Sequence, residues 1–183
     1  MNTIDISSTL GLSALGALTV NIALGVVIWS RKRINLPLGI PLLKAHKFTG
    51  YTAAVLILAH VGLIPLDPAS GFKWKDLLLP LWTKHQPYII TLGTLAFYLL
   101  AVVVASSYFK KKLKYKHWRK LHYLSYVAAL AFIVHGMWID PDLKDRPVDW
   151  LDGEKIFVEA CVVMIFGISV FRLRIKKENH PSP

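Results

Sequence analysis

Long apolar runs separated by short polar segments dominate the sequence. Five runs are each close to the ~20 residues that cross a bilayer as one helix, and they cover about residues 10–30, 46–66, 88–109, 118–139 and 156–173. Most charged residues, and turn-forming sequences such as DPASG, lie between these runs. The pattern predicts an all-α integral membrane bundle of five transmembrane helices, organised as a single domain over residues 1–183.

The composition agrees with a membrane protein. Hydrophobic residues make up 54% of the chain, which is above the roughly 45–50% of soluble globular domains. Cys161 is the only cysteine. The chain therefore forms no intrachain disulfide, and a thiolate zinc site or an iron–sulfur cluster held by this chain alone is excluded.

The basic residues are concentrated on one side of the predicted bundle. If the five spans alternate in direction, 16 of the 22 Lys and Arg residues fall in segments 31–47, 110–120 and 172–177, all on the same side. Because Lys and Arg favour the inner side of short loops, we expect the N-terminus outside and the C-terminus inside. The same bias explains the net charge of +11 without a nucleic-acid partner, and the run KKKLKYKHWRK is expected to meet anionic lipid headgroups.

Two of the predicted spans each carry a pair of histidines. His46 and His60 form the pattern H-x13-H on the second span, and His122 and His135 form the pattern H-x12-H on the fourth. An imidazole is costly to bury in hydrocarbon, so an intramembrane histidine indicates a function. The two spans run in the same direction. His46 is therefore paired with His122 at the inner end, and His60 with His135 about 20 Å further out, at ~1.5 Å per residue.

This pairing predicts two b-type haems, one above the other. Haem iron of this type binds one neutral imidazole on each face, and helical bundles build cofactor sites from side chains on facing helices. The angular positions fit less simply, because ~100° per residue places the histidines of the second span about 40° apart and those of the fourth about 140° apart. We therefore expect a distortion between Ser125 and Val134, or unequal haem orientations.

Other residues near the histidines suit a porphyrin. Three glycines would let a flat macrocycle approach the helix backbone, although small residues also simply pack membrane helices: Gly50, Gly62 and Gly136. Three basic residues are expected either to pair with the propionates of the inner haem or to mark the inner interface: Arg119, Lys120 and Lys47.

The sequence WRKLHYLSY at 118–126, followed by His135 and Trp138, resembles the ferric reductase-like transmembrane domain superfamily. This superfamily includes NADPH oxidases, ferric reductases and the MsrQ haem subunit of the bacterial periplasmic methionine sulfoxide reductase system. The resemblance covers about residues 40–140, and the two histidine spacings are its most specific part. It implies that His46 and His122 bind an inner haem b, and that His60 and His135 bind an outer one.

The chain also departs from its relatives. The family usually has six core spans, whereas five are predicted here. NADPH oxidases and eukaryotic ferric reductases add a cytoplasmic flavin and nicotinamide module, but no Gly-rich dinucleotide fingerprint occurs in this sequence. MsrQ proteins also lack that module, yet they often lack the first histidine, which this chain retains as His46.

These features predict transmembrane electron transfer by the cytochrome b subunit of a membrane oxidoreductase, located in the bacterial inner membrane. A separate flavoprotein or a quinol would donate electrons at the inner side, and an outer protein would accept them; flow in the opposite direction stays open. The alternative is a haem-free transporter or assembly factor whose histidines relay protons or metal ions. The substrate and the oligomeric state are left open by the sequence.

Overall fold

The computed structural model describes residues 3–31, 41–79, 81–140 and 147–178 of the 183. These residues form helices and connecting turns, with no strand among them. The long helices are α1 (Thr3–Ser30), α2 (Leu42–Leu63), α4 (Pro87–Tyr108), α5 (Tyr115–Trp138) and α6 (Gly153–Glu178). The short elements are α3 (Trp74–Leu78) and three 3₁₀ turns, η1 (Ile64–Leu66), η2 (Pro68–Ser70) and η3 (Lys110–Lys112).

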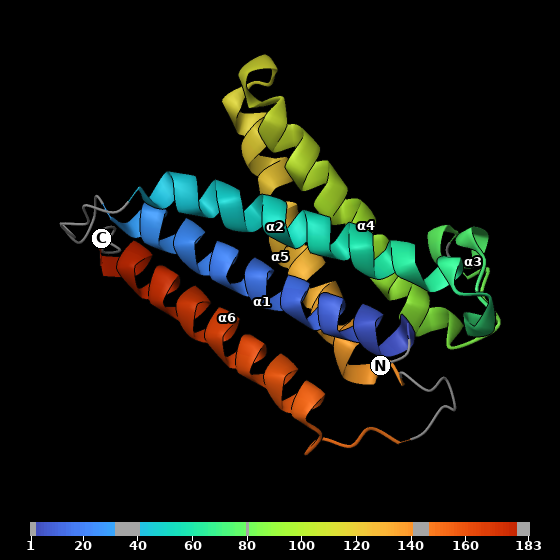
Figure 1. Cartoon of the computed structure of the whole chain (residues 1–183). Coiled ribbons are helices and arrows are strands. Elements are labelled where there is room, and N and C mark those ends of the chain that lie inside the picture. The colour runs from blue at the N-terminus through green and yellow to red at the C-terminus, as the bar shows by residue number, and fades with distance from the viewer. Residues whose placement is uncertain (1–2, 32–40, 80, 141–146, 179–183) are drawn as a thin grey trace.

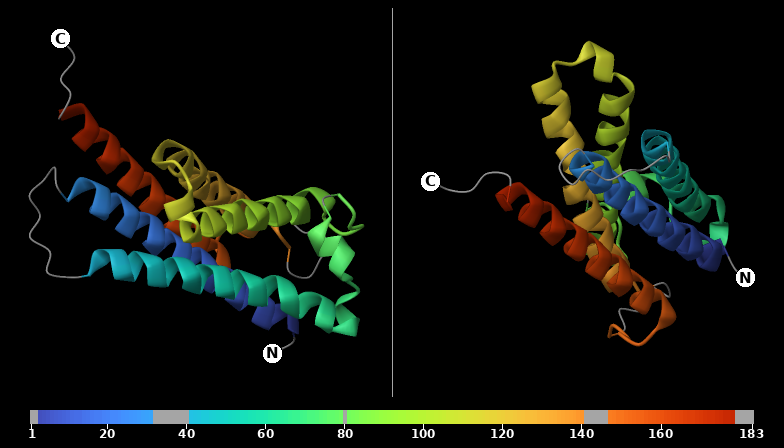
Figure 2. Two further views of the ribbon diagram at one scale, coloured as in Figure 1. Left: turned by 90° about the horizontal axis from the view of Figure 1, so that it is seen from above. Right: turned by 90° about the vertical axis from the view of Figure 1, so that its left-hand side faces the viewer.

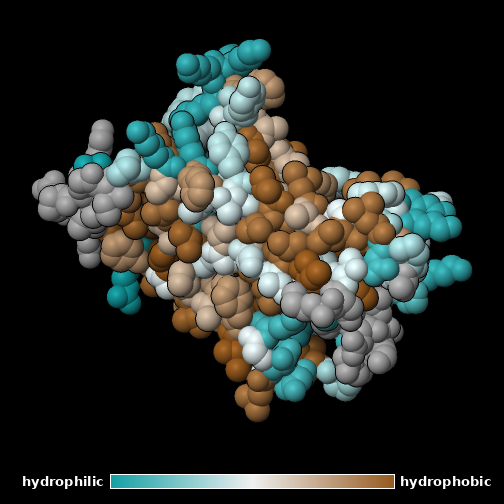
Figure 3. Space-filling model, viewed as in Figure 1, coloured by the Kyte–Doolittle hydropathy of each residue, from teal (hydrophilic) through white to brown (hydrophobic). Residues whose placement is uncertain are grey.

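The prediction of an all-α bundle with five membrane spans is confirmed. Five helices are long and apolar enough to cross a membrane, and each coincides with one predicted run. Their apolar side chains are widely exposed; Val163 and Phe166 on α6, for example, are 71% and 70% exposed. Such surfaces are costly in water but suit lipid, and the space-filling view shows hydrophobic residues across the middle of the molecule (Figure 3).

The five long helices form a layer and a crossing hairpin. α1 lies between α2 and α6, and the hairpin of α4 and α5 crosses this layer at a steep angle (Figures 1 and 2). α1 packs closely along α2, and α4 along α5, whereas α2 and α5 have few close backbone contacts. Side chains rather than backbones therefore span the space between α2 and α5.

The central core of the bundle is built from small and branched side chains. Gly and Ala let membrane helices approach closely, which favours packing where lipid offers no hydrophobic driving force. The buried members of this core come from four helices: Ala14, Leu18 and Ile22 on α1, Ala53 and Ile57 on α2, Leu100 on α4, and Ala128 and Ala129 on α5. On α2 and α5 these residues lie between the two histidines of each helix.

The two ends of the bundle differ in charge. At the basic end, α1 ends, α2 begins and the tip of the α4–α5 hairpin carries the exposed residues Lys110–Lys112 (Figure 3). At the acidic end, α1 begins, α5 ends and α6 begins, with Asp140, Asp152 and Glu154 nearby. The direction of the chain in the membrane stays a prediction from charge.

A short segment after α2 covers the acidic end of α4. Phe72 and Leu77 pack against Ile90 on α4, and the Thr94 hydroxyl donates a hydrogen bond of 2.6 Å to the Leu77 carbonyl. Pro87 occupies the first turn of α4, where a missing N–H has no cost. The segment thereby holds the end of α2, including His60, close to α4.

Candidate functional site

The four intramembrane histidines form two pairs, one near each end of the bundle. His46 of α2 and His122 of α5 form the basic-end pair, with ring centroids 6.1 Å apart and planes inclined by 67°. His60 of α2 and His135 of α5 form the acidic-end pair, with centroids 6.5 Å apart and planes inclined by 71°. The structure therefore brings together the partners that the sequence pairs.

These separations match two imidazoles that share one metal ion. With a metal–nitrogen bond of about 2 Å and a ring radius of about 1 Å, two imidazoles on opposite sides of an ion have ring centroids about 6 Å apart. Edge-to-face rings in direct contact also lie about 4.5–7 Å apart, so the distance is consistent with an ion between each pair without requiring one.

The expected distortion of α5 is absent. Residues 125–134 are all α-helical, and no 3₁₀ or π turn interrupts α5 between Tyr115 and Trp138. Instead, α5 crosses α2 at a steep angle (Figure 1), so the two helices need not present their histidines along parallel stripes. Crossing replaces the local distortion as the means of pairing His122 with His46 and His135 with His60.

Backbone carbonyls hold three of the four imidazoles. Nδ1 of His46 lies 3.0 Å from the Asn21 carbonyl, and Nδ1 of His60 lies 2.7 Å from the Ser7 carbonyl. Nδ1 of His135 lies 2.8 Å from the carbonyl oxygen of Ile89. A carbonyl only accepts, so Nδ1 carries the hydrogen in these rings and Nε2 keeps a lone pair. That tautomer is the one that binds a metal through Nε2.

The fourth imidazole has a different neighbour. Nδ1 of His122 lies 3.3 Å from the Ser107 hydroxyl, and this group can either donate or accept. One face of the His122 ring stacks on Trp118, with centroids 5.1 Å apart and planes inclined by 23°. The Lys110 ammonium lies 3.8 Å from the centre of the Trp118 ring. His122 is therefore held mainly by stacking rather than by a carbonyl.

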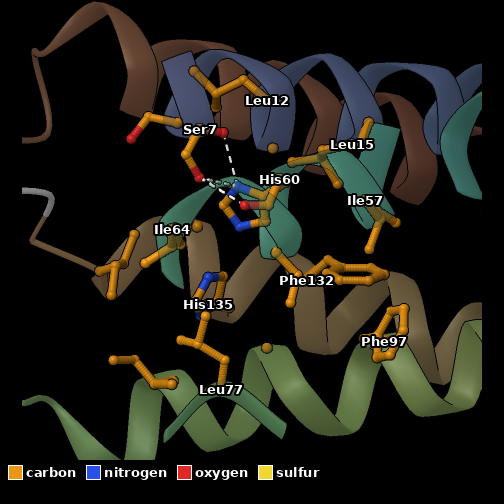
Figure 4. A pocket seen from close by; sticks show the side chains of 18 of the residues that line it. Ser7, Leu12, Leu15, Ile57, His60, Ile64, Leu77, Phe97, Phe132 and His135 are labelled. Carbon is orange, nitrogen blue, oxygen red and sulfur yellow. Dashed lines mark hydrogen bonds between the residues drawn. The ribbon is translucent and has the colours of Figure 1, made fainter. Parts of the chain in front are cut away.

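A cavity lies at the acidic-end pair. It has a volume of about 170 Å³ and its lining is mostly apolar, which is roughly ten times the space that one water molecule needs. His60 and His135 face each other in it, with Phe97 and Phe132 to one side (Figure 4). An apolar, aromatic cavity with two convergent nitrogens suits a flat apolar ligand that carries a metal.

The donor set also fits such a ligand better than a bare ion. Among the described residues, no group of three or more His, Cys, Asp or Glu side chains can hold a metal ion. Each pair offers only two nitrogens, whereas zinc sites take at least three protein ligands. An iron porphyrin brings its remaining four nitrogens itself, so two imidazoles complete its coordination.

The comparison with protein families identifies the family of the chain. The family described as ferric reductase like transmembrane component matches residues 8–133. The chain belongs to this family. The match confirms the resemblance seen in the sequence and indicates transmembrane electron transfer. No curated protein and no solved structure matches the chain.

In this ferric reductase-like chain, α1 contributes two residues that the sequence interpretation missed. Ser7 accepts from His60 through its backbone carbonyl, and its hydroxyl donates to the His60 carbonyl at 3.0 Å. Asn21 accepts from His46 in the same way, and its side-chain amide donates to the His46 carbonyl. The separation of Ser7 from Asn21 along the sequence equals that of His46 from His60. This matched spacing is the signal that could have revealed them.

Three glycines that were also missed make room for the histidines. A Cβ on Gly93 would lie 2.9 Å from His135 ring atoms, and one on Gly11 would lie 3.1 Å from the His60 ring. Each glycine comes one helical turn after the residue whose carbonyl binds the imidazole. The third member is Gly25, where a Cβ would lie 3.4 Å from His46. Helix surfaces without a Cβ thus allow the rings to reach the backbone.

The glycines predicted from sequence have nearest neighbours other than the imidazole rings. A Cβ on Gly50 would meet the Asn21 amide at 3.1 Å, and one on Gly62 would come only within 4.0 Å of Trp74. A Cβ on Gly136 would lie 3.6 Å from a side-chain carbon of Val158, and Gly136 also lines the acidic-end cavity. Their direct role at a cofactor stays a prediction, as does propionate binding by three exposed basic residues at the basic end: Arg119, Lys120 and Lys47.

A buried lysine also lies next to the acidic-end pair. Lys155 of α6 is 6% exposed, and its ammonium donates to the Gly136 and Ile139 carbonyls, both at 2.9 Å. Both carbonyls lie at the end of α5, within one helical turn after His135. The ammonium satisfies the end of the helix and places a positive charge near that histidine.

Proposed function

We propose that this ferric reductase-like chain, acting as one domain, carries electrons across the membrane through two b-type haems. The basic-end pair would hold one haem and the acidic-end pair the other. The observation that carries the proposal is the geometry of the pairs: centroid separations of 6.1 and 6.5 Å, with Nδ1 of three rings bound to carbonyls. Membership of the family supports electron transfer itself.

Four helices share the work of holding the cofactors. α2 and α5 supply the ligands, while α1 and α4 fix the rings through Ser7, Asn21 and Ile89. Carbonyl acceptors at Nδ1 orient each ring and increase the basicity of Nε2. Bound haem would supply iron that takes up and releases one electron at a time. Between the pairs, the packed core formed by α1, α2, α4 and α5 excludes water from the electron path.

We further propose that the basic end faces the cytoplasm of a bacterium and receives electrons there. A separate flavoprotein or a quinol would be the donor, and a protein beyond the acidic end would be the acceptor. The exposed run Lys110–Lys112 supports an acidic protein donor, because complementary charge steers association. Lys110 also contacts Trp118, which stacks on His122. The basic-end pair is therefore closest to such a donor.

The decisive experiment counts haems in the purified chain. The wild-type protein should contain about two haems per chain and show the sharp reduced α-band of bis-histidine iron. His60→Ala and His122→Ala should each remove one haem, because each destroys one pair. His117→Ala, which changes an exposed histidine near the basic end, is the matched control and should keep both.

Two outcomes would contradict the proposal. A wild-type chain without haem, purified from cells that make haem in excess, would favour the haem-free relay of protons or metal ions. Loss of both haems in His60→Ala, with the fold intact by circular dichroism, would show that the pairs are not independent sites.

A further inference from the structure

A cluster of aromatic and basic side chains lies where α1, α5 and α6 meet near the basic end. Arg172 of α6 donates from its two terminal nitrogens to the hydroxyls of Tyr126, at 2.8 Å, and Tyr123, at 3.0 Å. The guanidinium carbon lies 5.2 Å from the centre of the Trp29 ring of α1. The cluster therefore fixes one guanidinium among three aromatic rings.

A second arginine contacts the same ring. The guanidinium carbon of Arg119 lies 5.8 Å from the centre of the Tyr123 ring, and that of Arg172 lies 5.3 Å from it. Among the described side chains, no carboxylate pairs with either arginine. Both positive charges contact one ring, and Arg119 is exposed. An anion bound near both guanidinium groups would reduce their mutual repulsion.

The cluster also offers hydrogen-bond donors for which the described residues show no partner. Each tyrosine hydroxyl accepts a hydrogen bond from Arg172 and keeps its own hydrogen to donate. The Arg172 guanidinium has five N–H groups, and two nitrogens are committed to the tyrosines. Donors of this kind bind the oxygens of a phosphate or carboxylate with charge-assisted hydrogen bonds.

We propose that this cluster is a binding site for the phosphate group of an anionic phospholipid. Basic pockets between membrane helices bind such headgroups, and Trp and Tyr favour the interface where headgroups lie. Phe171 and Leu173, which flank Arg172 on α6, are 44% and 64% exposed and would contact the acyl chains.

A haem carboxylate is the alternative anion for this position. α1 lies between α2 and α6 (Figure 1), and Arg172 approaches α5 from the α6 side. His122, in contrast, meets His46 on the α2 side. Arg172 and His46 thus approach α5 from different helices, and the test below separates a lipid phosphate from a haem carboxylate.

The test measures lipid binding to the purified full chain by native mass spectrometry. Phosphatidylglycerol should bind at one preferred site, about tenfold more tightly than phosphatidylcholine, because its net charge is negative. Arg172→Gln should weaken phosphatidylglycerol binding about tenfold. Arg174→Gln, which removes the same charge from a nearby exposed position on α6, is the matched control and should leave binding unchanged.

Several results would overturn the proposal. Equal weakening by Arg172→Gln and Arg174→Gln would show that only net charge matters. Unchanged lipid binding with loss of haem in Arg172→Gln would assign the arginine to a cofactor carboxylate. Displacement of the lipid by millimolar inorganic phosphate would indicate a site for free phosphate.

Two milder variants keep the test valid if Arg172→Gln does not fold. Tyr126→Phe removes one hydroxyl and keeps the ring, and Arg119→Gln changes an exposed side chain. Each should weaken phosphatidylglycerol binding about threefold. Wild-type affinity in both would contradict the proposal.

Discussion

At the acidic end, both histidines of the pair donate from Nδ1 to backbone carbonyls; at the basic end, only His46 does so. His60 and His135 bind the carbonyls of Ser7 and Ile89, at 2.7 and 2.8 Å. His122 has the Ser107 hydroxyl at 3.3 Å instead. A carbonyl in a helix can neither rotate nor donate, so it fixes the tautomer, whereas a hydroxyl does not.

The surroundings also hold the acidic-end pair more firmly than the basic-end pair. The acidic-end pair lines an apolar cavity and has the buried cation of Lys155 close by. The basic-end pair has Trp118 stacked on one ring and the exposed Lys110 beyond it. One pair is therefore enclosed and rigidly held, and the other is connected to the surface. This difference suits a path with one end open to a soluble partner.

Gly93→Ala should have the largest effect, because the space around His135 is the tightest. A Cβ at Gly93 would lie 2.9 Å from ring atoms of His135, closer than real Cβ contacts allow. The ring cannot move aside without losing its bond to the Ile89 carbonyl. We expect loss of about one haem per chain, all of it from the acidic-end pair, measured by pyridine haemochrome and redox titration.

Two further variants complete that comparison. Gly25→Ala makes the same change beside His46, where the Cβ would lie at an ordinary 3.4 Å, and it should keep both haems. Gly167→Ala on α6 meets nothing within 4 Å and controls for the higher helix propensity of alanine. Equal haem loss from Gly25→Ala and Gly93→Ala would contradict the tighter fit at the acidic end.

Much of this fold follows from the sequence alone. Membrane helices are specified by the length and hydropathy of a run, so all five spans could be predicted, although α1 begins at Thr3 rather than near residue 10. The pairing of the histidines also followed, since His46 and His122 must lie at the same level if their spans are parallel. Both inferences depend on properties that are local to one span or on the alternation of spans.

The groups that hold the histidines in place could not be predicted in the same way. Ser7 and Asn21 act through α1, and their role depends on how α1 rotates against α2. Gly50 and Gly62 were chosen because they are close to histidines in sequence, whereas the glycines that contact the rings come from neighbouring helices. The expected distortion of α5 assumed parallel helices, and the crossing angle made it unnecessary. Interhelical geometry is what the sequence does not reveal.

Asn21→Ala should destabilise the chain more than Ser7→Ala. The larger loss of stability is thus expected at the basic end, whereas the larger loss of haem is expected at the acidic end. The Asn21 amide donates to the His46 carbonyl and, at 2.9 Å, to the Thr49 hydroxyl. The Ser7 hydroxyl donates to the His60 carbonyl and lies 2.9 Å from Nδ1 of His60, but that nitrogen keeps the Ser7 carbonyl as its acceptor when the hydroxyl is removed. Interhelical hydrogen bonds in membranes contribute about 0.6–2 kcal/mol each. We expect a loss of about 2 kcal/mol for Asn21→Ala and about 1 kcal/mol for Ser7→Ala.

Unfolding in a mixed-micelle denaturant series measures both losses. Asn21→Leu, which keeps the approximate size and shape of the side chain but cannot donate, is the matched variant and should resemble Asn21→Ala. An equal cost for Asn21→Ala and Ser7→Ala would remove this difference between the two ends.

Lys155→Met should lower the reduction potential of the acidic-end haem alone. A nearby cation favours the reduced iron, which carries one positive charge less, so removing the charge favours the oxidised form. A change of about 60 mV corresponds to a tenfold change in the one-electron equilibrium, and we expect a shift of that order. Lys155→Arg keeps the charge and should keep the potential; equal shifts in both variants would assign the effect to packing at the end of α5.

Ser107→Gly should have the smallest effect and should make the basic-end pair resemble the acidic-end pair. On α4, Ile89 and Gly93 contact His135. Val103 and Ser107 follow them at the separation that His46 has from His60, and Ser107 contacts His122. Removing the Ser107 side chain lets the His122 ring approach the Val103 carbonyl, as His135 approaches that of Ile89. A fixed Nδ1 donor makes Nε2 more basic and stabilises oxidised iron. The basic-end potential should therefore fall by about 30 mV in a spectroelectrochemical titration, while Ser107→Ala, which keeps the Cβ in the way, should not lower it. The same fall in both variants would show that the hydroxyl, rather than access to the carbonyl, distinguishes the two ends.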